Sequence, residues 1–452
     1  MAQHARFRYA GLDELKADIA RLGVNVPVSA NIEVLGKPIN IGKNTVPNRL
    51  AINPMEGCDG TADGRPGELT RRRYRRFAEG GAGLLWYEAT AVVDEGRANP
   101  RQLSINSGTA GDLAAMLAES LAAAKEAGCD RPYTVLQLTH SGRYSNPGGG
   151  PAPRVAAANP YLDGRFSSVY VMTDEDLERL EDRYVAAAVM AADAGFDAVD
   201  VKSCHGYLLA ELLSAHTREG RYGGSFENRT RMVSNIVDKI KSKLGDRLSI
   251  AVRLGVYDQL PYPYGWGVDR QDHYKPDFSE PARLLTLLRE KGVELFNISM
   301  GSPYYNPHLT RPYDVGPYLP PKHPLEGVEL MLGAVRTLQA AVPGAAFMGV
   351  GLSWLRHLAP YVAAGCIEQG WFNLAGFGRQ AFAYPGFAGD LLKKGAFDQA
   401  KTCLACSKCT VIMRDGGCTG CVPRDAAVYG PIYQKGRAGK AAAESDRVAE
   451  HL

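Results

Sequence analysis

The fold is decided by one stretch of the chain, residues 173–207, which reads TDEDLERLEDRYVAAAVMAADAGFDAVDVKSCHGY. It opens with a capping-box pattern at Thr173 to Asp176, so we expect a helix that begins there and ends at Gly195. Apolar residues then alternate through 197–201, which is typical of a short buried strand. A polar loop follows directly. One helix, one strand and one reactive loop therefore form a single unit.

The same unit recurs along the chain. Strands that alternate with mostly helical connections imply a parallel sheet. Eight such repeats over roughly 330 residues favour a closed (β/α)8 barrel, the TIM-barrel class of α/β fold. A doubly wound open sheet is the alternative, but no G-x-G-x-x-G pattern follows the first strand. The predicted strands are residues 50–53, 83–87, 133–138, 197–201, 248–254, 294–299, 346–350 and 370–374.

Two flanking regions complete the expected architecture. Residues 32–41 are predicted to form a hairpin that turns at Gly36-Lys37 and caps the bottom of the barrel. The strand–helix pattern ends after Lys394. We therefore expect a barrel over residues 1–395, followed by a cysteine-rich segment and a C-terminal tail over residues 396–452.

Composition and charge exclude several classes of partner. The chain has 452 residues, with 52 Lys and Arg against 49 Asp and Glu, which gives a formal net charge of +3. This near balance predicts no nucleic-acid partner and no membrane partner. No apolar run approaches the length of a membrane span, and the N-terminus lacks the apolar region of a signal peptide. We expect a cytoplasmic protein.

Five of the nine cysteines fall between Cys403 and Cys421. In an intracellular protein such clustering favours metal ligation over disulfides. Cys403, Cys406 and Cys409 are spaced so that their thiolates can reach one centre, and a more distant cysteine closes the cage. A run of three cysteines, each separated from the next by two residues, favours a four-iron cluster. Two C-x2-C pairs, the second of them Cys418 and Cys421, would suit zinc instead.

The loop after the strand at 197–201 holds Lys202, His205 and Tyr207. Ligands bind at the carboxyl ends of the strands in parallel α/β proteins. A phenol such as that of Tyr207 is a fitting proton donor to a carbon made basic by hydride addition. Lys202 or His205 suits the polarisation of a substrate carbonyl. Each residue alone is more common in a structural role, so the prediction depends on the three together.

Other strand ends add polar groups and glycines. Gln137 and Arg253 suit the carbonyl and imide groups of a flavin ring, whose anionic reduced form a nearby cation stabilises. Gly378 and Arg379 suit a phosphate held by backbone N–H groups and a guanidinium. A polar residue that is satisfied at the barrel mouth and a surface ion pair remain the structural alternatives for these positions.

The loop at 299–313 is rich in aromatic residues. Tyr304, Tyr305 and His308 suit the covering of a planar substrate, or else the loop packs on itself. Both interpretations remain open at the level of sequence.

Eight short motifs follow one another along the chain: PNRLAINPM (47–55), YEAT (87–90), QLTHSGRYS (137–145), HGYLLAELLS (205–214), RYGGSFENRTR (221–231), VRLG (252–255), GFGR (376–379) and CLACSKC (403–409). Together they resemble the old yellow enzyme superfamily. Within this superfamily, the motifs resemble the branch of NADH:flavin oxidoreductases that contain both a flavin and an iron–sulfur cluster. 2,4-Dienoyl-CoA reductase and trimethylamine dehydrogenase belong to this branch. The resemblance covers about residues 35–425, and the fifth and eighth motifs are the most specific.

The resemblance implies a barrel that binds FMN, with a 4Fe-4S cluster beside it. Tyr207 matches the proton-donating tyrosine of the family. By position, the isoalloxazine is expected beside Pro54, Met55, Ala89, Gln137 and Arg253, and the phosphate beside Gly351, Gly378 and Arg379. The implied cluster ligands are Cys403, Cys406, Cys409 and, in preference to Cys418, Cys421.

The chain departs from the family at two places. Old yellow enzyme itself binds the substrate carbonyl with a His/Asn pair, and here Lys202 and His205 hold those positions. The residue that usually tunes the flavin is Glu56. We therefore expect a small-molecule ligand other than a simple enone bound in the usual way, such as an acid or a thioester.

The larger relatives continue into a second domain with nucleotide-binding fingerprints, and this chain holds none. The predicted function is that of an ene-reductase-like oxidoreductase, in which FMN gives hydride to an activated C=C bond and Tyr207 gives the proton. We expect electrons from a separate donor protein or from NAD(P)H.

Two alternatives to this prediction remain. One is oxidative dehydrogenation or N-demethylation of an amine, in which Tyr304 and Tyr305 would cradle a methylammonium, although Lys202 would repel it. The other is a non-catalytic electron-transfer subunit, which the presence of Gln137, Tyr207 and Arg253 disfavours. The sequence leaves open whether the chain forms a homo-oligomer.

Overall fold

Eight parallel strands close into a barrel in the computed structural model, which describes residues 5–449. The last strand pairs with the first, through Ala375 and Leu50, so the sheet has no free edge. The prediction of a (β/α)8 barrel is confirmed, and an open sheet is excluded. The barrel strands are β3 (Leu50–Ile52), β4 (Leu84–Ala91), β5 (Tyr133–Thr139), β8 (Ala198–Val201), β9 (Ser249–Gly255), β10 (Leu295–Ser299), β11 (Ala346–Gly349) and β12 (Leu374–Phe377).

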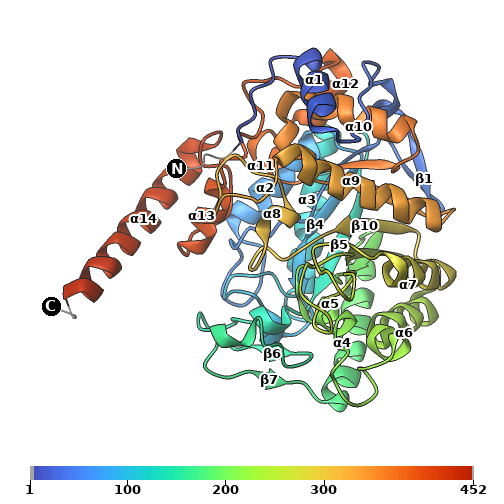
Figure 1. The fold of residues 1–452 in the computed structure, drawn as a ribbon, viewed down its shortest axis with the longest axis vertical. Coiled ribbons are helices and arrows are strands. Elements are labelled where there is room, and N and C mark those ends of the chain that lie inside the picture. Colours follow the sequence, from blue (N-terminus) through green and yellow to red (C-terminus); the bar gives the residue numbers. More distant parts are fainter. Residues whose placement is uncertain (1–4, 450–452) are drawn as a thin grey trace.

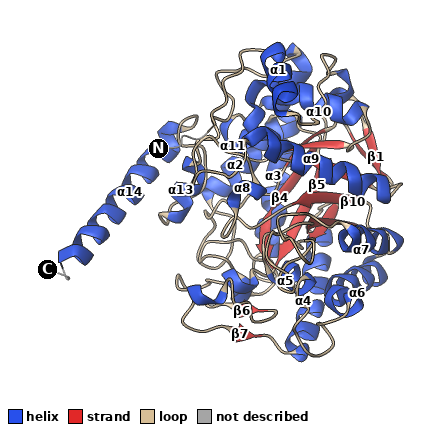
Figure 2. Cartoon of the chain, viewed as in Figure 1, coloured by secondary structure: helices blue, strands red, loops and turns tan. Residues whose placement is uncertain are grey.

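Helices surround the strands on the outside of the barrel (Figure 2). None of the helices within residues 5–449 combines the length and apolarity needed to cross a bilayer. The helices are α1 (Leu12–Leu22), α2 (Glu68–Glu79), α3 (Ala110–Glu126), α4 (Asp174–Asp193), α5 (Leu208–Leu213), α6 (Phe226–Leu244), α7 (Ser279–Glu290), α8 (Pro307–Thr310), α9 (Pro324–Ala341), α10 (Ala359–Glu368), α11 (Arg379–Ala383), α12 (Phe387–Lys394), α13 (Lys408–Arg414) and α14 (Ala426–Ala449).

The unit of α4 and β8 shows how the sequence builds this fold. The Thr173 hydroxyl accepts from the Asp176 amide, and the Asp176 carboxylate accepts from the Thr173 amide, so the predicted capping box is present. Gly195 has φ +96°, a conformation that side chains with a Cβ rarely adopt, and it turns the chain into β8. Leucines such as Leu177 bury one face of α4 against the barrel, each stabilising the fold by about 2 kcal/mol.

A hairpin closes the bottom of the barrel, but its turn lies elsewhere than predicted. It consists of β1 (Ile39–Ile41) and β2 (Asn44–Val46), with Gly42-Lys43 between them. Gly42 has φ +56°, which suits a tight two-residue turn. The predicted turn at Gly36-Lys37 is wrong, because residues 33–36 form a 3-10 helix. Ile41 and Val46 pack into the apolar cluster inside the barrel.

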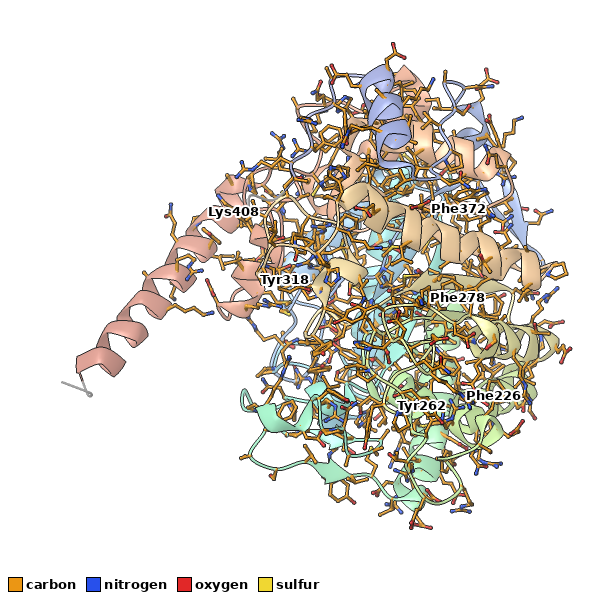
Figure 3. The ribbon with its side chains drawn as sticks, viewed as in Figure 1. Phe226, Tyr262, Phe278, Tyr318, Phe372 and Lys408 are labelled. Carbon is orange, nitrogen blue, oxygen red and sulfur yellow. The ribbon has the colours of Figure 1, made fainter. Side chains whose placement is uncertain are left out.

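The last strand begins four residues later than predicted. Residues 370–373 complete the turn from α10 instead, with Gly370 and Trp371 amides donating to the Ile367 and Cys366 carbonyls. Phe372, which is labelled in Figure 3, fills the space beside Gly349. The true strand reads LAGF, and its Gly376 gives it a weak sequence signal, because glycine is depleted in strands.

The cysteine-rich segment follows α12 and lies against one side of the barrel, with α13 in it, and α14 projects away from the body (Figure 1). Lys408, which begins α13 and is labelled in Figure 3, places its ammonium 5.6 Å from the ring centroid of Tyr433 on α14. Thr419 donates its amide to the Gly57 carbonyl at 2.6 Å, which joins this segment to the loop after β3. Residues 1–4 and 450–452 of the predicted regions lie outside the described residues.

Candidate active site

A cavity of about 340 Å³ opens at the carboxyl ends of the barrel strands, within the range of about 300–1,000 Å³ typical of ligand pockets. The site residues lie together there because parallel strands end at the same side of the barrel. Every predicted catalytic and cofactor-binding residue lines this cavity: Pro54, Met55, Glu56, Ala89, Gln137, Lys202, His205, Tyr207, Arg253, Gly351, Gly378 and Arg379.

One end of the cavity holds a hydrogen-bonded group around Tyr207. The Tyr207 hydroxyl donates to Glu56 Oε1 at 3.0 Å and lies 3.1 Å from the Tyr304 hydroxyl. The Lys202 ammonium lies 3.9 Å from Glu56 Oε1 and 3.8 Å from the Tyr207 ring centroid. The polar groups at this end therefore find partners within the protein.

Burial shifts the proton affinity of each of these groups. It raises the pKa of Glu56, and Lys202 and Tyr207 oppose this shift. Burial, with Glu56 as the next cause, raises the pKa of Tyr207 well above its ordinary value. Burial also lowers the pKa of Lys202, which Glu56 opposes. Removal from water thus brings the proton affinities of the lysine and the carboxylate closer together.

His205 stands beside this group in an unusual backbone conformation, with φ +66°. Its Nε2 atom lies 2.9 Å from the hydroxyl of Ser299, at the end of β10. Burial lowers the pKa of His205 well below its ordinary value, with Arg253 and Lys202 acting in the same direction. The imidazole is therefore neutral at pH 7.

A buried ion network fixes the loop that carries Glu56. Arg73 pairs with both Asp59 and Glu88, and all three side chains are almost fully buried. Glu88 accepts the Gly57 amide at 2.8 Å. Burial raises the pKa of Glu88 to about 7, which Arg73 opposes. The loop after β3 is thus tied to β4 and α2 directly next to Glu56.

A further buried carboxylate, Asp200 on β8, lies beneath the cavity. It accepts from Trp86 Nε1 at 3.0 Å, from Gln137 Nε2 at 2.6 Å and from the Arg253 amide at 2.6 Å. Burial raises the pKa of Asp200 to about 6, and the bond from Gln137 is the largest opposing cause. Asp200 therefore orients the side chain of Gln137 and fixes the backbone of Arg253.

The other end of the cavity leaves cationic and polar atoms without partners. Among the described residues, Arg311 Nε, Arg379 Nη1 and Thr310 Oγ1 are buried there and have no hydrogen-bond partner. Arg253 Nε, nearer to Lys202 and His205, is also buried without one. Burial, with Arg379 as the next cause, lowers the pKa of Arg311 to about 10. Buried donors of this kind call for an acceptor, and an anionic one satisfies two neighbouring guanidinium groups.

Two glycines line this end of the cavity, and methionines pack too closely against both of them to admit a Cβ. Gly351 has φ +89°, and a Cβ there would lie 2.7 Å from Met331 Sδ. A Cβ on Gly378 would lie 3.0 Å from Met55 Sδ. Glycine backbone that lines a cavity beside unpaired guanidinium groups suits a phosphate, so the residues present are able to hold FMN.

Four cysteines line a second, small cavity of about 20 Å³ next to the first. They are Cys403, Cys406, Cys409 and Cys421, and Cys409 lines both cavities. Cys418 lies apart, where its sulfur accepts from Arg101 at 3.5 Å. Among the described residues, no three His, Cys, Asp or Glu side chains converge on the position of one metal ion. The four thiols surround a cavity instead of a point.

The aromatic loop after β10 contributes one of its three candidate residues, Tyr304, to the main cavity. Tyr304 lines the main cavity and stacks on Tyr144, with ring centroids 3.8 Å apart. Tyr305 lines a different cavity, and His308 lines a third one beyond the barrel mouth. Of the two interpretations left open by the sequence, covering of the main cavity is therefore available to Tyr304, while the turn at residues 302–306 directs Tyr305 and His308 elsewhere.

Two residues of the site escaped the sequence analysis. Asp200 sits inside a strand, where its alternation with apolar neighbours was the only signal that it faces the barrel interior. Arg311 follows α8 in a loop without a recognised motif. The sequence signal for Arg311 was its position within an aromatic loop. A cation that becomes buried there needs an anionic or polar partner, which makes it a candidate for ligand binding.

A closed (β/α)8 barrel with proton-active and cationic side chains at its carboxyl end defines an enzyme of the TIM-barrel class. Residues 34–274 match the NADH:flavin oxidoreductase / NADH oxidase family, to which the chain belongs. This is the old yellow enzyme family of flavin-dependent oxidoreductases, as the motifs suggested.

Two relatives illustrate the similarity. The chain is 31% identical over 290 residues to a NADH:flavin oxidoreductase of Gibberella zeae, covering 58% of this chain and 66% of the relative. It is 32% identical over 273 residues to NADPH dehydrogenase of a Geobacillus species, strain WCH70, covering 60% of this chain and 73% of the relative.

Solved structures share the fold. The structure of 2-naphthoyl-CoA reductase with 2-naphthoyl-CoA matches with a TM-score of 0.71 and 22% identity, over 87% of this chain and 57% of that chain. Histamine dehydrogenase from Rhizobium sp. 4-9 matches with a TM-score of 0.65 and 19% identity, over 86% of this chain and 52% of that one. The present chain thus spans little more than half the length of either protein.

Proposed function

We propose that the chain binds FMN in the main cavity and reduces an activated C=C bond, with Tyr207 as the proton donor. The observation that carries this proposal is the Tyr207 hydroxyl, which lines the cavity and is held between Glu56 and Tyr304. When bound, FMN supplies a hydride to the β-carbon of the substrate. Tyr207 gives its hydroxyl proton to the α-carbon.

The chain's own residues divide the remaining work. Arg379, Gly351 and Gly378 hold the FMN phosphate, which satisfies the unpaired guanidinium nitrogen. Arg253 and Gln137 would face the polar edge of the ring, with the Gln137 side chain oriented by Asp200. Lys202 and the neutral His205 orient the carbonyl of an enoate, an enone or an enoyl thioester. NAD(P)H or a separate donor protein supplies the electrons.

We further propose that Cys403, Cys406, Cys409 and Cys421 hold a 4Fe-4S cluster. A zinc ion with bonds of about 2.3 Å would draw four thiolates to within about 3.8 Å of one another. A four-iron cluster instead ligates each thiolate at a separate iron, which suits thiols that surround a cavity. The proximity of Cys409 to the main cavity supports electron exchange with the flavin.

Replacing one cysteine at a time tests the ligand set. Cys421→Ser is expected to lose most of the iron and acid-labile sulfide of anaerobically purified protein. Cys418→Ser is the matched control, because Cys418 lies outside the cavity of thiols, and it should keep both. Iron loss in the Cys418 variant alone would reverse the assignment.

Turnover of the wild-type protein tests the reaction. Anaerobic protein is reduced with NADPH or, in place of a donor protein, with dithionite. With a set of enoates and enoyl thioesters it is expected to give products gaining two hydrogen atoms, as read by mass spectrometry. In deuterium oxide, the label should enter at the α-carbon. The proposal fails if FMN-loaded protein turns over none of them.

Amine dehydrogenation is the second candidate, because Glu56 places a carboxylate in the cavity where Tyr304 offers an aromatic face. The histamine dehydrogenase fold is shared, but Lys202 lies 3.9 Å from Glu56 and repels a cationic ligand. Mixing oxidised protein with tertiary and primary amines, and watching for bleaching of the flavin, separates the two reactions.

A further inference from the structure

The direction of the hydrogen bond from Tyr207 constrains when this residue can act. An ionised carboxylate only accepts hydrogen bonds. With Glu56 ionised, the Tyr207 proton therefore points to Glu56 Oε1, at 3.0 Å, and not to a substrate in the cavity. With Glu56 protonated, the carboxyl group can donate to Tyr207 and leave the phenolic proton free. The protonation state of Glu56 thus sets the direction of the Tyr207 proton.

The surroundings of Glu56 favour the protonated carboxyl group over the carboxylate. Its side chain is 15% exposed, and burial favours the neutral acid. The titratable groups that face it come from four segments: Cys58 on its own loop, Glu88 on β4, Lys202 and Tyr207 after β8, and Tyr304 after β10. Gln102 also donates to Glu56 at 3.3 Å. Lys202 is the only cation among these contacts.

We propose that Glu56 returns a proton to Tyr207 after each turnover, and that Lys202 holds the carboxylate which this transfer leaves. The inference rests on the proposed reduction of a C=C bond. Glu56 acts through Tyr207, so it is a positioning and proton-supplying residue, whereas Tyr207 contacts the substrate.

The step balances in protons and electrons. The hydride of the proposed reaction adds to the β-carbon, and the Tyr207 O–H bond breaks as the α-carbon gains its C–H bond. The resulting phenolate takes the carboxyl proton of Glu56. This transfer is downhill, because the proton moves from a carboxylic acid to a phenolate whose conjugate acid is much weaker. A proton from water, entering through the cavity, restores the acid.

The loop holds Glu56 at the required distance. Gly57 is bound on both sides, by its amide to Glu88 at 2.8 Å and by its carbonyl to the Thr419 amide at 2.6 Å. Because the neighbouring peptide is fixed, the carboxyl group stays within reach of Tyr207 through the cycle.

The decisive variant is Glu56→Gln, which keeps the side-chain size and can still hydrogen-bond Tyr207, but carries no transferable proton. In a single turnover of reduced, FMN-loaded protein, the first product should form at a rate within about threefold of the wild type. Steady-state turnover should fall about a hundredfold, at the lower end of the effects of acid–base groups. The result is a burst of one product per site.

Three further readouts distinguish proton return from a structural role. Rapid-scan near-ultraviolet absorbance should show ionised tyrosine building up after the burst in Glu56→Gln only. The steady-state rate of the wild type should fall as pH rises through the pKa of Glu56, and the variant should lack this limb. In a Tyr207→Phe background, Glu56→Gln should add no further loss.

Controls make each outcome decisive. Glu95→Gln removes an exposed carboxylate by the same chemical change and should behave as wild type. Equal slowing of the first and later turnovers, with no tyrosinate signal and an unchanged pH profile, would overturn the proposal. Should Glu56→Gln fail to fold, Glu56→Asp keeps an acid farther from Tyr207, and the proposal requires a burst there too.

Failure of the proposed function is recognised separately. Wild-type protein that turns over no C=C substrate ends the proposed reaction. The contact between Glu56 and Tyr207 is still tested in that case by a pH titration of tyrosine labelled with carbon-13 at its ζ position. The Tyr207 signal should titrate at lower pH in Glu56→Gln, because the carboxylate raises the pKa of Tyr207.

Discussion

The two ends of the main cavity differ in how their polar groups are satisfied. At one end, Tyr207, Glu56 and Lys202 contact one another, and this group is complete within the protein. At the other end, Arg311 and Arg379 keep buried nitrogen atoms without partners among the described residues. Both ends lie at the mouth of the same barrel.

The difference indicates what each end is built to hold. Unpaired buried donors carry a free-energy cost that a permanently bound anion removes. A permanently bound anion is therefore expected beside Arg379 and Arg311. A substrate binds only transiently and must leave again. The polar groups at the end that contacts it should therefore have partners within the protein when no substrate is bound. The paired end therefore suits the substrate, and the unpaired end suits the resident phosphate.

The largest expected effect is at the paired end. Tyr207→Phe should slow reduction of a C=C substrate by about 10²- to 10⁴-fold, because the phenol supplies the proton. The FMN content of the variant should equal that of the wild type, since Tyr207 belongs to the paired end and not to the end that holds Arg311 and Arg379. Stopped-flow reoxidation of reduced protein and the visible spectrum measure the two properties. Loss of FMN with unchanged chemistry would invert the assignment of the two ends.

The next effect is at the unpaired end. Arg379→Met should weaken FMN binding about 10- to 100-fold, since a hydrogen bond to a charged group contributes about 1.5–3 kcal/mol. Titration of the apoprotein with FMN, followed by flavin fluorescence, measures this. Arg179→Met on α4, whose side chain is 70% exposed, is the matched control. Equal affinity in both variants would place the phosphate elsewhere.

A smaller effect of opposite sign is expected at Arg311. Burial and the neighbouring Arg379 disfavour its charge, so Arg311→Met should stabilise the apoprotein by about 1 kcal/mol. The same variant should bind FMN less tightly than the wild type. Urea denaturation of apoprotein and of FMN-loaded protein separates the two effects. A destabilised apoprotein would mean that Arg311 already has its partner.

The smallest expected effect concerns the pH profile. Lys202 lowers the pKa of Glu56 against the effect of burial. Lys202→Met removes this opposition, so the pKa of Glu56 should rise further and the falling limb of the steady-state rate should move to higher pH by about one unit. The pH profile of each protein is normalised to its own maximum rate. Any effect of Lys202 on the substrate carbonyl then cancels. A shift to lower pH would contradict the contact.

Much of the barrel was predictable because local patterns carry it. Helix caps such as that of α4, and alternation in β8, are set by neighbouring residues. The positions of Lys202 and Tyr207 followed from the rule that parallel strands end on one side. The start of β12 was misplaced because its Gly376 suits the close packing against Met348 and not the propensity of a strand.

The contacts between distant loops were not predictable in the same way. Nothing in the spacing of the chain joins Glu56 to Tyr207, or Arg311 to Arg379, because each pair comes from loops after different strands. The separation of Cys418 from the other thiols likewise depends on Arg101, which lies far away in the sequence. Sequence patterns supply candidate residues, and only the closed barrel shows which of them face each other.

A crystal structure of the anaerobically purified protein with a bound enoyl analogue tests the division of the cavity most directly. We expect the FMN phosphate within hydrogen-bond distance of Arg379 Nη1, and the double bond of the analogue beside the Tyr207 hydroxyl. A phosphate bound at Lys202, with the analogue against Arg379, would contradict it.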